Sequence, residues 1–396
     1  MPLPVLFENK TECCGCGACR NICPKGAIRM VEDSCGYIYP EITPELCIEC
    51  GRCKQVCAFQ NKKETQTPKK VYAAVAKNQD LQRTSASGGI FAVLAQAVLE
   101  KGGVVCGAAF TEGWKVEHIL IERVKDLYKL QGSKYTHSHT EMSYQKTKAF
   151  LKEGRPVLYS GTPCQIAGLY AYLNKEYENL MTVDIICHGV PSNRMFIDYV
   201  NMLEKKEKSR MTAFSFRDKR MGWGINGSAA FENGRIRKIW QSSSSYFYYF
   251  VKGMLYRENC YQCPYASKHR PADITLGDYW GIEKAHPDYL GKGGFDESKG
   301  ISVAIANNEK GAALLKEYGE GIECKDSEFE AAARHNGQLN HPCDKGNRDD
   351  IVMLYRDKGW GAVESRFNSK IGWRRYTSQI KALLPASIKR ILKGLK

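Results

Sequence analysis

The sequence lacks the segments that carry a chain into or across a membrane. No run approaches the roughly 20 apolar residues of a membrane span. The start, MPLPVLFENK, has neither the basic region nor the apolar stretch of a secretory signal peptide. Basic residues interleaved with aromatic ones form no recurring array, so we expect no nucleic-acid partner. These absences favour a cytoplasmic protein, in which thiols stay reduced.

Cysteine, in contrast, is abundant, with 17 residues in a chain of 396. The length predicts two or three domains, and 43% hydrophobic residues indicate a folded globular protein. Eight of the cysteines form two copies of one pattern, and the second copy is displaced by 34 residues: Cys13, Cys16, Cys19 and Cys23, then Cys47, Cys50, Cys53 and Cys57. Reduced thiols at such spacing indicate metal binding rather than disulfides.

This spacing is that of bacterial iron–sulfur proteins with two clusters. The fourth cysteine of each run serves the other cluster, and we expect it to start a short helix. We predict two 4Fe–4S clusters, one on Cys13, Cys16, Cys19 and Cys57 and the other on Cys47, Cys50, Cys53 and Cys23. Zinc is the alternative, but four ligands satisfy it, so it does not explain an eightfold register. Cys14 and Cys35 fall outside the register and are predicted to be spectators.

Residues 5–60 thus resemble a two-cluster bacterial-type ferredoxin domain, although Ala58 stands where the second run usually has proline. Glycines at positions 15, 17 and 51 would let backbone N–H groups approach the sulfurs. The polar residues 61–70 then read as a linker.

Beyond residue 70, strand and helix patterns alternate. Buried strands are predicted at 71–76, 103–110 and 155–161 and from residue 180 to Cys187, and helices over 88–103, from about 162 and from about 193. This order predicts an α/β domain with a mixed, partly parallel sheet, which follows the α+β ferredoxin-like domain. Ser85 and Ser87 are candidate N-caps of the first of these helices. Its start suits a phosphate, and an ordinary capped helix is the alternative.

Four further cysteines lie near the ends of these elements. Cys164 falls in the first turn of a helix, Cys187 at the end of a strand, and Cys260 and Cys263 form a pair in a loop. Ligands bind at the carboxyl edge of parallel sheets, so the four could converge on a third 4Fe–4S cluster. A zinc ion and isolated buried thiols are the alternatives. Cys106, Cys324 and Cys343 have no partner at ligand spacing.

Seven motifs in order suggest a family. They are ASGGIF, GSKY, SGTPCQIAGL, CHGVPS, FRDKRMGWG, CYQCPYA and ADITLGDYWGI. Together they resemble the coenzyme F420 hydrogenase/dehydrogenase beta-subunit family, in the branch with an N-terminal two-cluster ferredoxin domain, over residues 5–345. The resemblance implies FAD or another flavin beside an iron–sulfur cluster. It implies flavin contacts from Ser85, Ser87, Gly88, Gly89, Ser133, Lys134 and Tyr135, and third-cluster ligands Cys164, Cys187, Cys260 and Cys263.

The resemblance also implies a domain division. It gives a ferredoxin domain (1–60), a linker (61–70), a flavin-binding part (71–145), a C-terminal α/β part (146–345) and a basic helical tail (346–396). The implied function is that of an iron–sulfur flavoprotein oxidoreductase, which passes electrons between clusters and a flavin that serves an unidentified acceptor. The alternatives are a non-catalytic electron-transfer subunit and a zinc-stabilised basic binding protein. The partner would be a redox protein or a small-molecule acceptor, and no catalytic residue is assigned.

Basic residues suggest two further contacts. Arg217, Lys219 and Arg220, with Trp223, in FRDKRMGWG could receive an anionic planar substrate, or form a solvated turn. The net charge is +15, and the last 27 residues, from Lys370, hold eight basic residues and no acidic ones. The final helical pattern could contact an anionic membrane surface peripherally or fold back on its own domain. His188, beside Cys187, is a candidate proton donor or a structural histidine.

Overall fold

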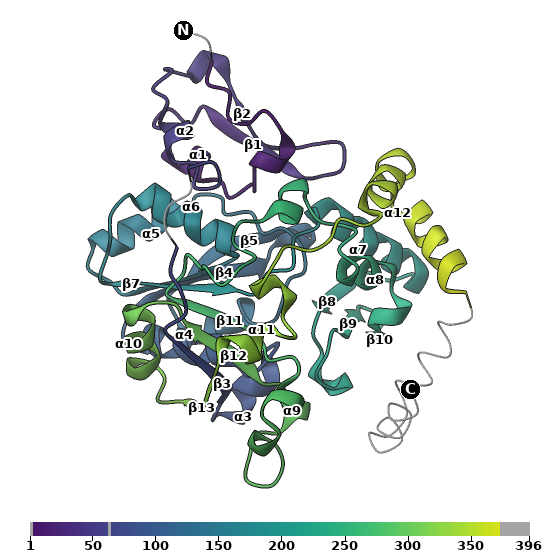
Figure 1. Cartoon of the computed structure of the whole chain (residues 1–396). Helices are drawn as coiled ribbons and strands as arrows, with labels where there is room; N and C mark the ends of the chain where they lie inside the picture. The colour runs from purple at the N-terminus through teal and green to yellow at the C-terminus, as the bar shows by residue number, and fades with distance from the viewer. Residues whose placement is uncertain (1–2, 62–64, 373–396) are drawn as a thin grey trace.

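The computed structural model describes residues 3–61 and 65–372, which fold as a mixed α/β protein. Figure 1 shows three parts: a cysteine-rich N-terminal part at the top, a large sheet between helices, and a smaller sheet with its own helices at the right. The described strands form a two-stranded, a three-stranded and an eight-stranded sheet.

The N-terminal part is built on a hairpin and two short helices. The strands are β1 (Ile28–Glu32) and β2 (Ile38–Ile42), which pair antiparallel, and the helices are α1 (Ala18–Ile22) and α2 (Arg52–Gln55). Gly17 and Gly51 precede these helices with φ of 74° and 70°, a conformation that favours glycine. The helices therefore begin before the third cysteine of each run. Cys23 ends α1 and Cys57 follows α2, so the prediction that the fourth cysteine starts a helix is wrong.

The eight-stranded sheet has the order β13-β3-β12-β11-β7-β6-β4-β5. Its strands are β3 (Lys70–Ala76), β4 (Val104–Phe110), β5 (Val116–Ile121), β6 (Val157–Gly161), β7 (Leu180–Ile185), β11 (Ile274–Asp278), β12 (Ser302–Ala306) and β13 (Ile322–Ser327). The four central strands β4, β6, β7 and β11 are parallel, and their outer neighbours are antiparallel. The predicted mixed sheet is confirmed. The strand predicted to end at Cys187 ends two residues earlier, at Ile185, and residues 186–192 form the loop that follows it.

Helices cover both faces of this sheet. One face packs on α4 (Ile90–Glu100) and α10 (Glu309–Glu317), and the other on α5 (Ser143–Lys152), α6 (Pro163–Leu173), α9 (Ile282–Ala285) and α11 (Phe329–Ala333). The serine N-caps predicted for α4 are wrong. A short helix, α3 (Gln79–Thr84), precedes the turn, and Gly89 with φ of 91° occupies the N-cap position. Ser85 and Ser87 instead donate to the carbonyls of Leu81 and Ile301.

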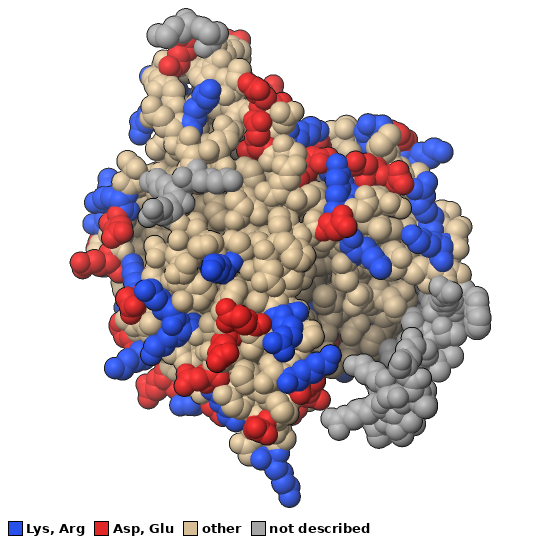
Figure 2. Space-filling model, in the orientation of Figure 1, with Lys and Arg blue, Asp and Glu red and all other residues tan. Residues whose placement is uncertain are grey.

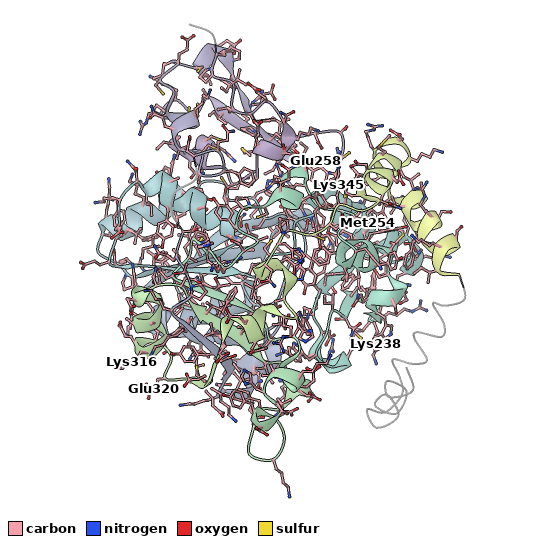
Figure 3. The ribbon with its side chains drawn as sticks, in the orientation of Figure 1. Lys238, Met254, Glu258, Lys316, Glu320 and Lys345 are labelled. Atoms are coloured by element: carbon pink, nitrogen blue, oxygen red, sulfur yellow. The ribbon has the colours of Figure 1, made fainter. Side chains whose placement is uncertain are left out.

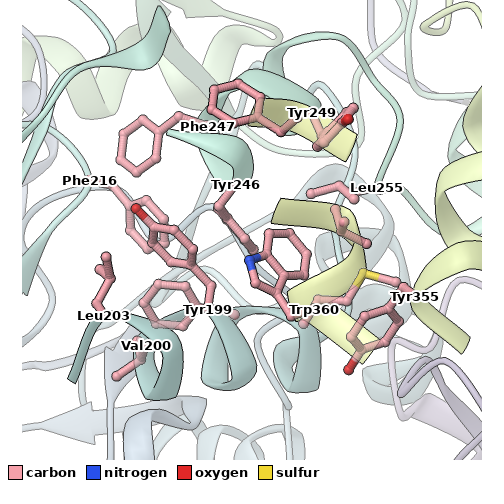
Figure 4. Close-up of a cluster of buried hydrophobic side chains, with 14 of the residues drawn as sticks. Tyr199, Val200, Leu203, Phe216, Tyr246, Phe247, Tyr249, Leu255, Tyr355 and Trp360 are labelled. Carbon is pink, nitrogen blue, oxygen red and sulfur yellow. The ribbon is translucent and has the colours of Figure 1, made fainter. Parts of the chain in front are cut away.

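The third part holds an aromatic core (Figure 4). It comprises α7 (Asn193–Glu207), β8 (Met211–Ser215), β9 (Gly227–Phe231), β10 (Ile236–Ile239), α8 (Ser245–Val251) and α12 (Arg348–Ile371). Tyr199, Tyr246 and Trp360 pack ring to ring there. Residues 348–371, predicted as the start of a basic tail, therefore form two helical segments that meet at the non-helical Gly359 and bury one face. The remainder of that predicted tail, with its membrane-contact pattern, lies outside the described residues.

Short 3-10 helices fill the described connections: η1 (Lys10–Glu12), η2 (Pro44–Leu46), η3 (Glu112–Trp114), η4 (Val124–Lys129), η5 (Lys219–Met221), η6 (Gln241–Ser243), η7 (Glu258–Gln262), η8 (Pro287–Tyr289), η9 (Glu297–Lys299) and η10 (Gly337–Leu339). In the predicted linker, Gln66 exchanges two backbone hydrogen bonds with Arg270.

Both signs of charge are interspersed over the face shown in Figure 2. Over the described ranges, every helix is too short or too polar to cross a membrane.

Candidate functional site

A cavity of about 280 Å³ opens at the carboxyl edge of the parallel strands. Gly161 at the end of β6, Ile185 at the end of β7 and Asp278 at the end of β11 all line it. Ligands of open α/β sheets bind at this edge because the connecting loops diverge there. The position of the cavity therefore identifies it as the candidate binding site.

Six of the seven residues predicted to contact a flavin line this cavity: Ser85, Ser87, Gly89, Ser133, Lys134 and Tyr135. Gly88 does not line it. The N–H of Gly88 donates to Ser302 Oγ at 2.9 Å, and a Cβ at this position would lie 2.3 Å from the carbonyl oxygen of Ala74. Gly88 therefore lets the turn before α4 pack against β3 and β12, which positions its neighbours at the cavity.

Lys134 supplies the cavity with a titratable cation. Its Nζ donates to the carbonyls of Lys129 at 3.1 Å and Gln131 at 2.9 Å, and no carboxylate within the described ranges pairs with it. Burial lowers the pKa of Lys134 to about 7 because no negative charge offsets the lost hydration. An anionic ligand would restore the charge of this lysine.

Three histidines, His118, His137 and His188, also line the cavity. Burial lowers the pKa of each, that of His118 to about 4, so the three imidazoles are neutral at pH 7. His118 bonds Ser138 Oγ and the Ser160 carbonyl, whereas the buried Nε2 of His137 has no hydrogen-bond partner among the described residues. His118 and His137 were missed in the sequence because neither lies in a recognisable motif.

Most side chains of the basic loop after β8 make hydrogen bonds within the protein. Arg217 is buried and donates to both carboxylate oxygens of Asp278, at 2.7 and 3.0 Å, and to the Tyr135 hydroxyl. Trp223 donates to the same carboxylate, and Lys219 donates to two backbone carbonyls. The prediction that this loop presents Arg217 and Lys219 to an anionic substrate is therefore wrong, whereas Arg220 is exposed and pairs with Asp218. Asp278, whose role the sequence left open, fixes the loop at the cavity.

Both predicted cysteine quartets surround small cavities in the N-terminal part. One cavity is lined by Cys13, Cys16, Cys19 and Cys57, together with Cys14 and Cys53. The other is lined by Cys23, Cys47, Cys50 and Cys53. In the part of the chain that the structure describes, no three His, Cys, Asp or Glu side chains converge as ligands of a single metal ion. The thiols of each quartet thus line the walls of one cavity.

The four remaining candidate ligands come together from three segments. Cys164 and Cys187 line the main cavity, Cys260 lies in η7, and Cys263 ends it. Burial first, and then the neighbouring thiols of Cys187 and Cys263, raises the pKa of Cys260 well above its usual value. Buried thiols this close together ionise only when a cation compensates them, which is what a metal centre supplies.

The cysteines outside these groups have two kinds of environment. Cys14 is buried, interacts by hydrogen bonding with Cys16 and Cys164, and lines both the main cavity and that of the first quartet. It therefore lies between two groups of candidate ligands. The others are packed or exposed thiols: Cys35 and Cys106 are buried, Cys343 is partly buried, and Cys324 is exposed.

Two models of one family match most of the sheet domain. The model for the coenzyme F420 hydrogenase/dehydrogenase beta-subunit N-terminus matches residues 71–143, and that for its C-terminus matches residues 154–330. The ferredoxin-like residues precede both matches.

Two curated relatives match parts of the chain. A subunit of the F(420)H(2) dehydrogenase of Methanosarcina mazei is 26% identical over 165 residues, which cover 39% of this chain and 46% of the relative. Coenzyme F420-dependent sulfite reductase of Methanocaldococcus jannaschii is 27% identical over 213 residues, 50% of this chain and 31% of the relative. The chain thus spans about half or less of these relatives. A chain from the F420-reducing NiFe hydrogenase complex of Methanosarcina barkeri aligns with TM-score 0.45 and 16% identity over 73% of this chain and 93% of its own.

Proposed function

Because the chain belongs to the coenzyme F420 hydrogenase/dehydrogenase beta-subunit family, we propose that it is an iron–sulfur flavoprotein oxidoreductase. Electrons would pass between two ferredoxin-type 4Fe–4S clusters, a third cluster and a flavin. One observation carries the proposal: the same cavity is lined by cysteines of the third group and by the residues expected to contact a flavin. A redox centre and an organic cofactor bound there would be neighbours.

The chain's own residues fit a flavin at this cavity. The turn of Ser85, Ser87 and Gly89 would hold the phosphates at the start of α4, where unpaired N–H groups and the helix dipole favour anions. Lys134 would place a positive charge beside the anionic ligand. A bound flavin supplies both hydride and single-electron transfer, which lets it exchange electrons with one-electron clusters.

Twelve cysteines would hold the clusters, in three sets of four: Cys13, Cys16, Cys19 and Cys57; Cys47, Cys50, Cys53 and Cys23; Cys164, Cys187, Cys260 and Cys263. The glycines of the first runs support this assignment, since Gly15, Gly17 and Gly51 have positive φ and leave the loops free of side chains beside the sulfurs. Cys14 interacts with Cys16 of the first set and with Cys164 of the third, so the clusters of these two sets would be neighbours in the electron path.

The names of both relatives make coenzyme F420 the first electron donor or acceptor to test. The second candidate function is that of an electron-transfer subunit whose acceptor binds on a partner protein. The Methanosarcina mazei relative, which is one subunit of a dehydrogenase, favours this alternative. Turnover by the isolated chain separates the two candidates.

Anaerobic purification followed by iron, sulfide and flavin analysis tests the proposal. We expect about twelve irons and one flavin per chain, as three four-iron clusters require. Replacing Cys187 and Cys263 together by serine should remove about four irons. The matched control, Cys324→Ser on exposed β13, should remove none. An iron content unaffected by the double substitution would contradict the third cluster. Iron without flavin, even after reconstitution with FAD, would favour the subunit alternative.

A further inference from the structure

Arg257 is a buried cation without a carboxylate partner. Four arginines are buried in the described part of the chain: Arg217, Arg257, Arg270 and Arg348. Three of them form ion pairs, Arg217 with Asp278, Arg270 with Asp184 and Arg348 with Glu258. Arg257 is only 1% exposed, and no Asp or Glu of the described ranges pairs with it.

The contacts of Arg257 are polar but uncharged. Its guanidinium donates to the carbonyls of Ile38 and Cys13, both at 2.9 Å, and to Asn259 Oδ1 at 3.1 Å. The ring of Tyr39 lies 4.5 Å from its central carbon. Glu258, the next residue in the chain, turns away to Arg348 and to Lys345, whose Nζ lies 3.4 Å from it (Figure 3).

Such an arrangement requires a negative charge from another source. Arginine remains protonated in proteins, so burial cannot neutralise it. Hydrogen bonds to carbonyls orient the guanidinium, but they do not cancel the desolvation cost of a full buried charge. The three paired arginines show how this chain normally meets that cost. The compensating charge at Arg257 must therefore come from groups other than carboxylates.

Three thiols and the Tyr39 hydroxyl are the groups that interact electrostatically with Arg257, and burial raises the pKa of Tyr39 so that it stays neutral. Arg257 interacts electrostatically with Cys13 and Cys14 on one side and with Cys260 on the other. The Cys260 N–H donates to the Arg257 carbonyl at 3.1 Å, so η7 holds the two residues together. On the opposite side, Gly15 admits the side chain, because a Cβ there would lie 2.9 Å from Nη1. Cys13 belongs to the first proposed quartet and Cys260 to the third.

We propose that Arg257 is the shared counter-charge of the first and third clusters and raises the reduction potentials of both. This inference rests on the proposed function. Reduction adds an electron to a cluster that its four thiolates already make anionic, so a fixed positive charge in a buried site favours the reduced form. The second quartet includes the exposed Cys50 and none of the cysteines that interact with Arg257. Arg257 is a positioning residue in this scheme, because it acts through the clusters.

Redox titration of the anaerobic holoprotein, followed by electron paramagnetic resonance, tests the proposal. Arg257→Gln should lower two of the three midpoint potentials and leave the third unchanged. Arg257→Lys, which keeps the charge, should return both toward the wild-type values. Cys50→Ala identifies the unmoved signal, since it alters the second cluster. As a matched control we choose Arg20→Gln, because Arg20 adjoins Cys19 but is paired with Glu141 and should shift no potential.

A second variant serves if Arg257→Gln does not assemble its clusters. Asn259→Asp keeps the size of the side chain and places a carboxylate where Arg257 Nε now donates. It should lower the same two potentials by cancelling the charge of Arg257. Unchanged first and third potentials in either variant, with full iron content, would overturn the proposal. Equal shifts in all three clusters would overturn it as well. A wild-type chain without clusters would instead refute the proposed function, which the iron count reveals beforehand.

Discussion

Gly168 links the packing of α6 to the first cysteine run, and we predict that a single added methyl group there disturbs both. A Cβ at Gly168 would lie 2.9 Å from Cys16 Sγ and 3.1 Å from the Tyr144 hydroxyl oxygen, whereas ordinary contacts begin at 3.4 Å. Hydrogen bonds hold both Cys16 and Tyr144 in place. Thr140 Oγ1 donates to the Cys16 carbonyl at 2.7 Å, and the Tyr144 hydroxyl donates to the Gln165 carbonyl at 2.8 Å. The methyl group must therefore displace one of them.

The magnitude follows from two opposing effects. Overpacking a buried site costs about 1–3 kcal/mol. Glycine to alanine in a helix interior returns about 1 kcal/mol. We expect Gly168→Ala to lower the free energy of unfolding of the apoprotein by about 1 kcal/mol, and Gly168→Val by about 3 kcal/mol, because valine is larger and stiff at χ1. Gly361, in the first turn of the second segment of α12 after the non-helical Gly359, is the control, since open space surrounds its missing Cβ. Gly361→Ala should gain about 0.5–1 kcal/mol.

Urea unfolding of the apoprotein measures these changes, and iron analysis of the anaerobic protein measures their effect on the site. A displaced Cys16 should cost Gly168→Val about four irons per chain. Gly168→Ala as stabilising as Gly361→Ala would refute the packing argument. A full iron content in a folded Gly168→Val would refute the role of Cys16 as a ligand in this position.

Three further changes test the residues around the main cavity. Asp278→Asn strips buried Arg217 of its carboxylate and should lower the free energy of unfolding in urea by about 3–5 kcal/mol; a loss below about 1 kcal/mol would contradict the buried pair. Since the pKa of Lys134 is about 7, binding of an anionic flavin should take up a proton above pH 7. FAD affinity, followed by fluorescence quenching, should then fall by up to about tenfold per pH unit above pH 7, and Lys134→Met should abolish that slope. Thr162→Ala removes the capping box of α6 and should lower the free energy of unfolding, measured by thermal unfolding, by about 1 kcal/mol. An unchanged stability would show that the cap has no energetic role.

Local patterns in the sequence predicted the elements that local interactions determine. The strands β3, β4 and β6 match the predicted ranges to within two residues, because short apolar runs read as buried strands. The start of α6 was equally predictable, since Thr162 and Gln165 form a capping box and Pro163 occupies the first helical position. The cysteine quartets were predicted from spacing alone, and each now surrounds a cavity.

The errors arose where a neighbour outside the motif decided the structure. Serines usually cap helices, but Gly89 in the left-handed region caps α4, and Ser85 finishes α3. The charge of Arg217 predicts an exposed side chain. Arg217 is buried because it pairs with Asp278, which lies 61 residues away in the sequence. Arg257 has no sequence signature at all, since its contact with Cys13 spans 244 residues. Pairings of that length depend on the complete fold.

The first cysteine run binds the N-terminal part to the sheet domain through the same residues that the proposed function uses. Cys16 packs on Gly168 of α6, the Cys13 carbonyl accepts from Arg257, and Cys14 interacts with Cys164. Asn21 adds hydrogen bonds with Glu141 and Gln145 beside α5. These contacts are buried and belong to the loop itself, so the separation of the first and third cysteine groups is set by core packing rather than by linker length. Under the proposed function, electron exchange between these two groups should therefore be sensitive to any substitution that moves the loop.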